Sequence, residues 1–190
     1  MRLLVIGAHH GVGAHLLRLA GAAGHDAAGF EGDVLDAATT ERAVAGRDAV
    51  LSTLGPRRGS ADGLCSRGTA NIVAAMRSGG VRRLIQVTGA IIGHPRRNLG
   101  LFYRTIAAMV PARALADRRE QERLVMTSGL DWTLIRPTRP TDAAPRRRWR
   151  DSPHARVAAF AHIARADVAA AMLRALADEA TIGQALTLQY

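Results

Sequence analysis

Lysine is absent from this 190-residue sequence, so all 26 of its basic residues are arginines. That absence excludes a lysine Schiff base, the phosphate-binding lysine of a Walker loop and the Tyr-x-x-x-Lys pair that many dehydrogenases use. The formal net charge of +10 raises the question of nucleic-acid binding. The arginines are scattered, however, and the 4% aromatic content leaves few platforms on which bases could stack. We therefore expect no nucleic-acid partner.

Cysteine and long apolar runs are also scarce. The single cysteine, Cys65, excludes an internal disulfide and a Cys-x-x-Cys redox or zinc motif. No apolar run approaches the roughly 18 residues of a membrane helix. We expect no membrane partner, no signal peptide and a cytoplasmic location. His9, His10 and His15 lie close together without a carboxylate at ligand spacing, so no metal site is expected.

Strand-like and helix-like segments alternate along the chain. The expected strands are residues 3–6, 27–30, 49–53, 84–88, 132–136 and 186–189, and the expected helices are residues 12–23, 40–45, 68–78, a short one between Pro95 and Pro111, 114–127 and 167–177. This order predicts one doubly wound Rossmann-type α/β domain over residues 1–190. Its sheet would be mainly parallel, with helices on both faces.

Three further expectations concern the second half of the chain. In residues 114–127 the charged side chains, Glu122 among them, are expected on the solvent face of the helix, opposite Leu115, Leu124 and Val125. Residues 138–153 contain many prolines and arginines and predict a loop. Asp167 is a candidate N-cap for the last helix.

A glycine-rich loop, Gly7-Ala8-His9-His10-Gly11-Val12-Gly13, connects the first expected strand to the first expected helix. Gly7 permits a tight turn, while Gly11 and Gly13 let backbone N–H groups and the helix approach a pyrophosphate. The spacing differs from Gly-x-Gly-x-x-Gly. We expect a bulky residue at Gly13 to weaken dinucleotide binding more than folding.

Together with this loop, several downstream motifs resemble the NAD(P)H-binding group of atypical short-chain dehydrogenase/reductases, which includes the biliverdin/flavin reductases and the NmrA-like regulators. The motifs are Gly-Asp-Val-Leu-Asp (32–36), residues 44–50, Leu-Gly (54–55), residues 68–76 and Ser-Gly-Leu-Asp-Trp-Thr-Leu-Ile-Arg-Pro (128–137). The resemblance covers nearly the whole chain. It implies a Rossmann fold in which Asp33 and Val34 face the adenine, and Leu54 and Gly55 line the path of the ribose and nicotinamide.

The loop and the resemblance together give a set of candidate cofactor-binding residues: Gly7, His9, His10, Gly11, Val12, Gly13, Asp33, Val34, Leu54, Gly55, Arg57 and Thr88.

Two residues are candidates for catalysis. Thr88 lies at the end of a central strand and is expected to face the nicotinamide, and Gly89 stands where the family carries a serine. Tyr103 precedes Arg104 and is similar to a catalytic tyrosine with a cationic neighbour, although the expected lysine position holds Ala107. The alternative for Tyr103 is a packing aromatic beside Phe102.

The segment between His25 and Gly32 is shorter than in the relatives, which carry there an arginine that can hold the 2′-phosphate of NADP. Glu31 could instead accept a hydrogen bond from a ribose 2′-hydroxyl and favour NAD, or it could belong to a strand. Both NADP and NAD stay open as cofactors.

The expected function is hydride transfer from NAD(P)H to a small acceptor that the sequence does not identify, such as a flavin, a quinone or a carbonyl compound. The alternative is a non-catalytic NAD(P)-binding redox sensor of the NmrA-like kind. A third possibility is that the protein no longer binds a cofactor, because the segment between His25 and Gly32 is short. The protein is expected to be a monomer or a homodimer.

Overall fold

The computed structural model describes residues 1–56, 59–94, 98–153 and 156–190. Its main strands are β1 (Arg2–Ile6), β2 (Asp26–Gly29), β3 (Ala49–Ser52), β4 (Arg83–Val87), β5 (Asp131–Pro137), β7 (Arg150–Ser152) and β9 (Gln184–Gln189). They form one seven-stranded sheet in the order β2-β1-β3-β4-β5-β9-β7. Neighbouring strands are parallel except β7 and β9. The mainly parallel sheet is therefore confirmed.

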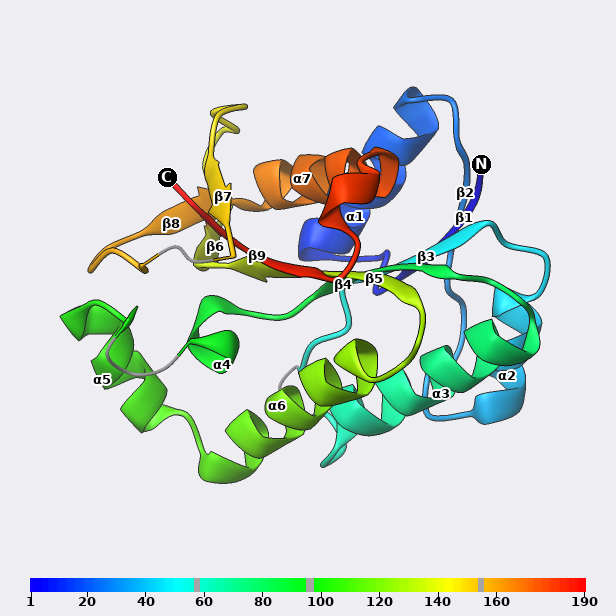
Figure 1. Cartoon of the computed structure of the whole chain (residues 1–190), viewed down its shortest axis with the longest axis horizontal. Helices are drawn as coiled ribbons and strands as arrows, with labels where there is room; N and C mark the ends of the chain where they lie inside the picture. The colour runs from blue at the N-terminus through cyan, green and yellow to red at the C-terminus, as the bar shows by residue number, and fades with distance from the viewer. Residues whose placement is uncertain (57–58, 95–97, 154–155) are drawn as a thin grey trace.

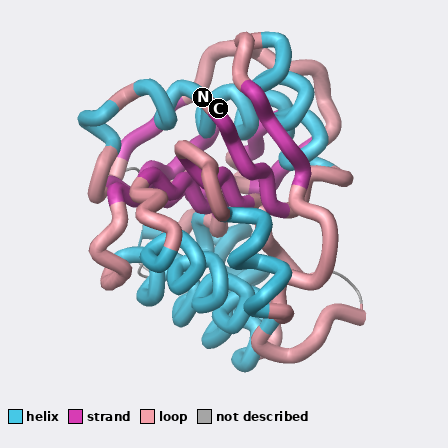
Figure 2. Tube along the Cα trace, turned by 90° about the vertical axis from the view of Figure 1, so that its right-hand side faces the viewer, coloured by secondary structure: helices cyan, strands magenta, loops and turns pink. Residues whose placement is uncertain are grey.

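Helices cover both faces of this sheet (Figures 1 and 2). The larger helices are α1 (Gly11–Ala22) and α7 (Arg165–Ala177) on one face, and α2 (Ala37–Val44), α3 (Leu64–Ser78) and α6 (Ala112–Met126) on the other. The shorter α4 (Ala90–Gly93) and α5 (Leu101–Met109) lie at one end of the second face. A short 3-10 helix, η2 (Glu179–Thr181), precedes β9. The doubly wound Rossmann-type architecture is confirmed.

The apolar run of β1 shows why both faces carry helices. Side chains alternate along a strand, so Leu3 and Val5 enter the core beneath α1 and α7, while Leu4 and Ile6 enter the core beneath α2 and α3. All four side chains are buried. A strand that is buried on both faces requires such an unbroken apolar run.

The order of the strands fixes where a ligand can bind. The chain passes from β1 to β2 on one side and then returns to β3 on the other side of β1. At such a reversal the two connections leave on opposite faces and open a crevice beyond the carboxyl ends of the strands. The glycine loop follows β1, and Thr53 to Gly55 follow β3.

Two helices begin three or four residues earlier than the sequence predicted. Helix α2 starts at Ala37 rather than at residue 40, because the Asp36 carboxylate accepts a hydrogen bond from the backbone N–H of Ala38 at 3.0 Å. Helix α3 starts at Leu64 rather than at residue 68. Its first turn is capped by a residue that is distant in the sequence. The Asp117 carboxylate of α6 accepts from the backbone N–H groups of Cys65 and Ser66 at 3.1 and 2.8 Å.

The loop prediction for residues 138–153 was wrong in part. This segment contains β7 and also β6 (Arg139–Thr141), which pairs in parallel with β8 (His162–Ala164) in a separate two-stranded sheet. Each of these strands has three residues. They are too short to show an alternation of apolar residues that sequence analysis could detect.

Two side-chain predictions in the second half were also wrong. Glu122 is not on the solvent face of α6 but is buried, at 4% exposure. Asp167 is not an N-cap, because Ala164 occupies that position. Its buried carboxylate accepts instead from the backbone N–H groups of Arg146 and Arg147 and from the Tyr190 hydroxyl. Asp167 thus anchors the segment before β7 to the first turn of α7.

Candidate functional site

A cleft of about 1040 Å³ opens at the carboxyl ends of β1 and β3. Its walls include nine of the candidate cofactor residues: Gly7, His9, His10, Gly11, Val12, Asp33, Val34, Leu54 and Gly55. Gly13 and Thr88 are not among the lining residues, and Arg57 lies outside the described residues. A smaller cavity of about 340 Å³ between α7 and β9 is lined by none of the candidates.

The glycine loop has the backbone geometry of an anion site. Gly7 and Gly11 adopt φ angles of +79° and +54°, the left-handed region that favours glycine. His10 is the N-cap of α1, but its side chain makes no capping hydrogen bond to the described part of the chain. The backbone N–H of Gly13 already donates to the His10 oxygen at 3.1 Å, so the N–H groups of Gly11 and Val12 and the positive end of the helix dipole are those available to a phosphate in the cleft.

Gly13 serves packing within this loop. A Cβ at Gly13 would lie 2.0 Å from the backbone oxygen of Gly7 and 2.9 Å from the Thr53 Oγ1. The Thr53 hydroxyl itself donates to the backbone oxygens of Ile6 and Gly7, at 3.0 and 3.2 Å. Helix α1 therefore touches the end of β1 at this point. The atoms of a bulky residue at Gly13 would meet backbone, so we expect folding to be damaged as well as dinucleotide binding.

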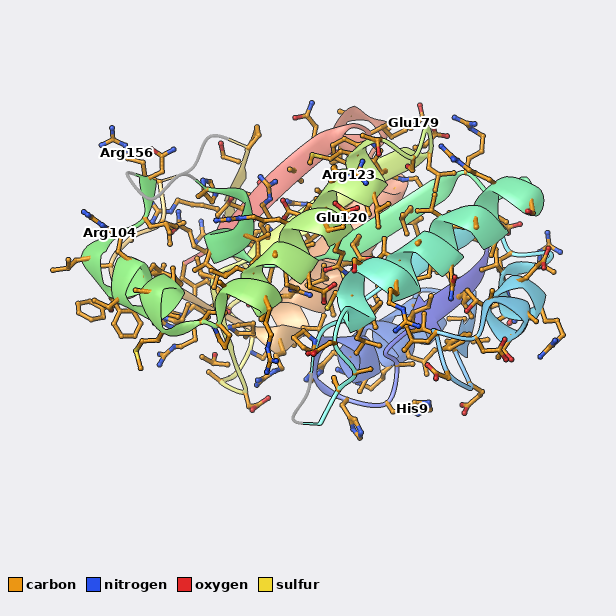
Figure 3. All side chains as sticks on the ribbon, turned by 90° about the horizontal axis from the view of Figure 1, so that it is seen from below. His9, Arg104, Glu120, Arg123, Arg156 and Glu179 are labelled. Carbon is orange, nitrogen blue, oxygen red and sulfur yellow. The ribbon has the colours of Figure 1, made fainter. Side chains whose placement is uncertain are left out.

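His9 and Glu31 lie at the outer rim of the cleft. His9 projects outward from the loop (Figure 3), and its Nε2 is 3.4 Å from the Glu31 Oε1. Glu31 follows the last residue of β2, Gly29, by two positions and is largely exposed. The structure thus places Glu31 beyond the strand and beside the glycine loop.

The Asp33–Val34 segment forms an adjacent part of the wall. The Asp33 carboxylate accepts from the backbone N–H of Leu35 at 2.9 Å, which closes a tight turn. The backbone oxygen of Val34 accepts from the Asn71 side-chain amide of α3, also at 2.9 Å. Asn71 was not a candidate residue. It fixes the segment predicted to face the adenine without lining the cleft itself.

Arg118 is a second residue that the sequence analysis missed. Its Nη1 donates to the backbone oxygen of Leu54 at 3.0 Å and to the Gln121 Oε1 at 3.1 Å. The same guanidinium lies 3.5 Å from the position of a Cβ on Gly55 and 4.0 Å from that on Gly89. Arg118 therefore connects the segments that follow β3 and β4. The helical pattern of residues 114–127 predicts it instead on the charged, solvent-facing side of the helix.

Thr88 belongs to a buried polar network behind the cleft. Its hydroxyl donates to the Glu122 Oε1 at 2.6 Å, and both residues are 4% exposed. Glu122 also accepts from the Arg136 Nε at 3.0 Å and from its Nη2 at 2.6 Å. The guanidinium of Arg136 packs against Gly93, where a Cβ would overlap it. The Thr88 hydroxyl is thus bound to a carboxylate and does not line the cleft.

Tyr103 is buried in a small apolar cluster with Ala161 and other residues. Its hydroxyl donates to the backbone oxygen of Ala161 and accepts from the backbone N–H of Arg139 at 2.8 Å. Its ring meets Phe102 edge-on at a centroid distance of 5.8 Å. Both hydroxyl bonds join segments of the fold, so the geometry supports the packing interpretation over the catalytic one.

The described residues contain no group of three or more His, Cys, Asp or Glu side chains placed to hold a metal ion. Among their helices, none has both the length and the apolar character needed to cross a membrane. The Cys65 thiol is buried, and this burial raises its pKa, which disfavours the reactive thiolate.

The chain is similar to known proteins at two levels, that of a sequence family and that of solved structures. Residues 18–179 match the NAD(P)H-binding family. This range begins within α1, so the glycine loop precedes it.

Three solved structures share the fold. One is a short-chain dehydrogenase/reductase from Veillonella parvula DSM 2008 in complex with NADP, with 18% identity, a TM-score of 0.80 and coverage of 99% of this chain and 94% of that chain. The anaerobillin reductase ChuY from Escherichia coli O157:H7 has 22% identity, a TM-score of 0.80 and coverage of 98% and 95%. The oxidoreductase YlbE from Lactococcus lactis has 16% identity, a TM-score of 0.82 and coverage of 99% and 90%.

Proposed function

The chain belongs to the NAD(P)H-binding family, and from this membership we propose that it transfers a hydride from a bound nicotinamide dinucleotide to a small acceptor such as a flavin, a quinone or a carbonyl compound. The observation that carries the proposal is the wall of the cleft, where two left-handed glycines adjoin an α1 N-terminus without a side-chain cap among the described residues. Two proteins of the same fold, from Escherichia coli and Lactococcus lactis, are a reductase and an oxidoreductase.

The residues of the cleft divide among the parts of the cofactor. We assign the pyrophosphate to Gly7, Gly11 and Val12, with His9 and His10 at the rim. Asp33 and Val34 would face the adenine, while Leu54 and Gly55 would line the path toward the nicotinamide. These assignments follow from the switch point between β1 and β3, at which dinucleotides bind in open α/β sheets.

The proposed reaction requires few catalytic side chains, because the bound dinucleotide supplies the hydride. The hydroxyls of Thr88 and Tyr103 are both engaged within the fold. A flavin or quinone that has accepted a hydride can take the one proton that completes its reduction from water, so such an acceptor needs no acidic side chain. We therefore favour these acceptors over carbonyl compounds, whose reduction usually requires a proton donor.

We further propose that the protein prefers NAD(H) to NADP(H). Glu31 follows β2 beside the glycine loop, where a carboxylate can accept from a ribose 2′-hydroxyl and repels a 2′-phosphate. Calorimetry with NAD, NADH, NADP and NADPH should show that NAD and NADH, which lack the 2′-phosphate, bind about tenfold more tightly than NADP and NADPH. Glu31→Gln should reduce this ratio. Tighter binding of NADPH than NADH by the wild type would contradict the preference.

Turnover tests the main proposal. Purified protein with NADH should reduce a flavin or a quinone, as measured by the loss of absorbance of the reduced nicotinamide against a reaction without protein. If calorimetry shows NADH binding but no flavin, quinone or carbonyl compound is reduced above background, the reductase assignment is wrong. If none of the four cofactors binds, the fold has lost its cofactor.

A second candidate function is a redox sensor that binds the cofactor without catalysis. The engagement of the Thr88 and Tyr103 hydroxyls within the fold favours it. A sensor must bind NAD and NADH with different affinities, because a ligand shifts an equilibrium only by its differential affinity. Equal dissociation constants for the two forms would remove this alternative.

A further inference from the structure

An arginine from the far end of the chain reaches the glycine loop. Arg165 is the first residue of α7, which packs beside α1 on the same face of the sheet (Figure 1). Its side-chain stem crosses Gly11, with Cδ 3.5 Å and Nε 3.6 Å from the position of a Cβ there. Its Nη1 is 2.6 Å from the Oδ1 of Asp142, in the segment after β6. Arg165 and Asp142 both line the cleft.

The charge of the cleft makes this arginine distinctive. The described lining residues include the carboxylates of Asp33 and Asp142, and Arg165 is the one arginine among them. The sequence has no lysine to add to it. A pyrophosphate carries negative charge, and arginine is the side chain best suited to bind it, since its planar guanidinium can donate two parallel hydrogen bonds.

We propose that the Arg165 guanidinium binds the pyrophosphate of the dinucleotide, and that the Asp142 carboxylate competes with the pyrophosphate for it. The inference rests on the proposed placement of the pyrophosphate at the glycine loop. It adds a cation from α7 to a site whose other phosphate ligands are backbone N–H groups of α1.

The surroundings of Arg165 suit this exchange. The first turn of α7 is held firmly, because the buried Asp167 binds the segment before β7 and the Tyr190 hydroxyl accepts from the backbone N–H of Ala164 at 3.1 Å. The Asp142 side chain is 84% exposed and that of Arg165 is 31% exposed. An ion pair with so exposed a partner contributes little, so a doubly charged pyrophosphate can displace the carboxylate.

The proposal predicts opposite effects for the two partners. Arg165→Gln should weaken binding of NADH and of ADP by about tenfold or more, while binding of adenosine, which lacks phosphate, should not change. Arg165→Lys retains the positive charge and should recover part of the lost affinity. Asp142→Asn should strengthen binding of NADH and ADP, because the guanidinium no longer has a competing anion. Calorimetry with the three ligands gives each dissociation constant.

Arg174→Gln is the matched control. Arg174 lies on the same helix, forms an ion pair with Asp151 and stacks over Trp149 at 4.9 Å, but it does not line this cleft. Its replacement should leave NADH and ADP binding unchanged. Thermal unfolding of each variant without ligand separates a loss of affinity from a loss of folded protein.

The double variant tests the competition itself. With Arg165→Gln in place, Asp142→Asn should have no further effect on NADH binding. An equal gain in both backgrounds would mean that Asp142 acts by direct repulsion, which overturns the competition. If the wild type binds NADH, and the Arg165→Gln variant binds NADH and ADP as tightly as the wild type does, then Arg165 is not a pyrophosphate ligand although the proposed function stands. If the wild type binds neither ligand, the inference and the proposed function both fail.

Discussion

The glycine loop follows β1, the buried network lies at β4 and β5 on the other side of β3, and the two are built by different means. The loop uses backbone: left-handed glycines, a close contact at Gly13 and the N-terminus of α1. The network uses side chains from three elements, namely Thr88 after β4, Glu122 on α6 and Arg136 on β5. A backbone site leaves glycines at fixed spacing in the sequence. A side-chain network leaves no such spacing, since Thr88 and Glu122 are 34 positions apart.

The difference extends to stability. A buried ion pair contributes little net free energy, because desolvating two charges costs about as much as their attraction returns, but loss of one partner leaves a buried charge. The glycine loop contains no such pair. The substitutions that it tolerates are limited by the close contact between Gly13 and the backbone of Gly7. Charge substitutions should therefore damage the network most, and added volume should damage the loop most.

The largest effect is expected at Glu122. Glu122→Gln removes the charge that compensates Arg136 in a buried site and should lower the free energy of unfolding by about 3–5 kcal/mol. Denaturant unfolding measures it. Glu120→Gln is the control, because Glu120 pairs with Arg123 on the exposed side of the same helix (Figure 3) and should contribute little. Equal losses for the two variants would mean that burial does not distinguish these ion pairs.

The next largest effect is expected at Gly13. Gly13→Ala places a Cβ 2.0 Å from the backbone oxygen of Gly7, which must shift, and should cost about 1–3 kcal/mol of unfolding free energy. Gly21→Ala on the same helix meets no atom within 4 Å and should instead stabilise the protein by up to about 1 kcal/mol. The opposite signs are the test. A stable Gly13→Ala variant would show that α1 does not touch β1 as described.

The sequence predicted well where local pattern and local contacts coincide. The apolar run at residues 3–6 predicted the strand β1, which the structure buries on both faces, and the glycine loop after it indicated where the cleft opens. One local signal was overlooked: Asp36 directly precedes α2 and caps it. Recognition of that cap would have given the start of the helix.

The remaining errors involve contacts between distant parts of the chain. Asp117 of α6 caps α3, 51 positions away at Ser66, and Arg118 binds the backbone oxygen of Leu54, 64 positions away. Helical periodicity assigned both residues, with Glu122, to a solvated face, because charge normally indicates exposure. Here the partners come from other elements. The hydrophobic pattern of α6 alone could not reveal them.

The smallest effect, a pH dependence, is expected at His94, which lies beside the network. Its Nε2 is 2.6 Å from the Thr187 Oγ1, and burial, followed by the positive charge of Arg136, lowers its pKa from the ordinary 6.5, with Glu122 opposing this in part. Above the ordinary pKa the imidazole is neutral in both states. As pH falls below it, the unfolded chain binds a proton that the native protein resists, so stability falls until the native pKa is passed. The Tm of wild type should therefore drop more between about pH 7.5 and about pH 5 than that of His94→Gln, with the other histidines common to both proteins. Parallel Tm profiles would show that His94 is protonated as easily in the folded protein as in the unfolded chain. Neither burial nor the positive charge of Arg136 would then lower its pKa.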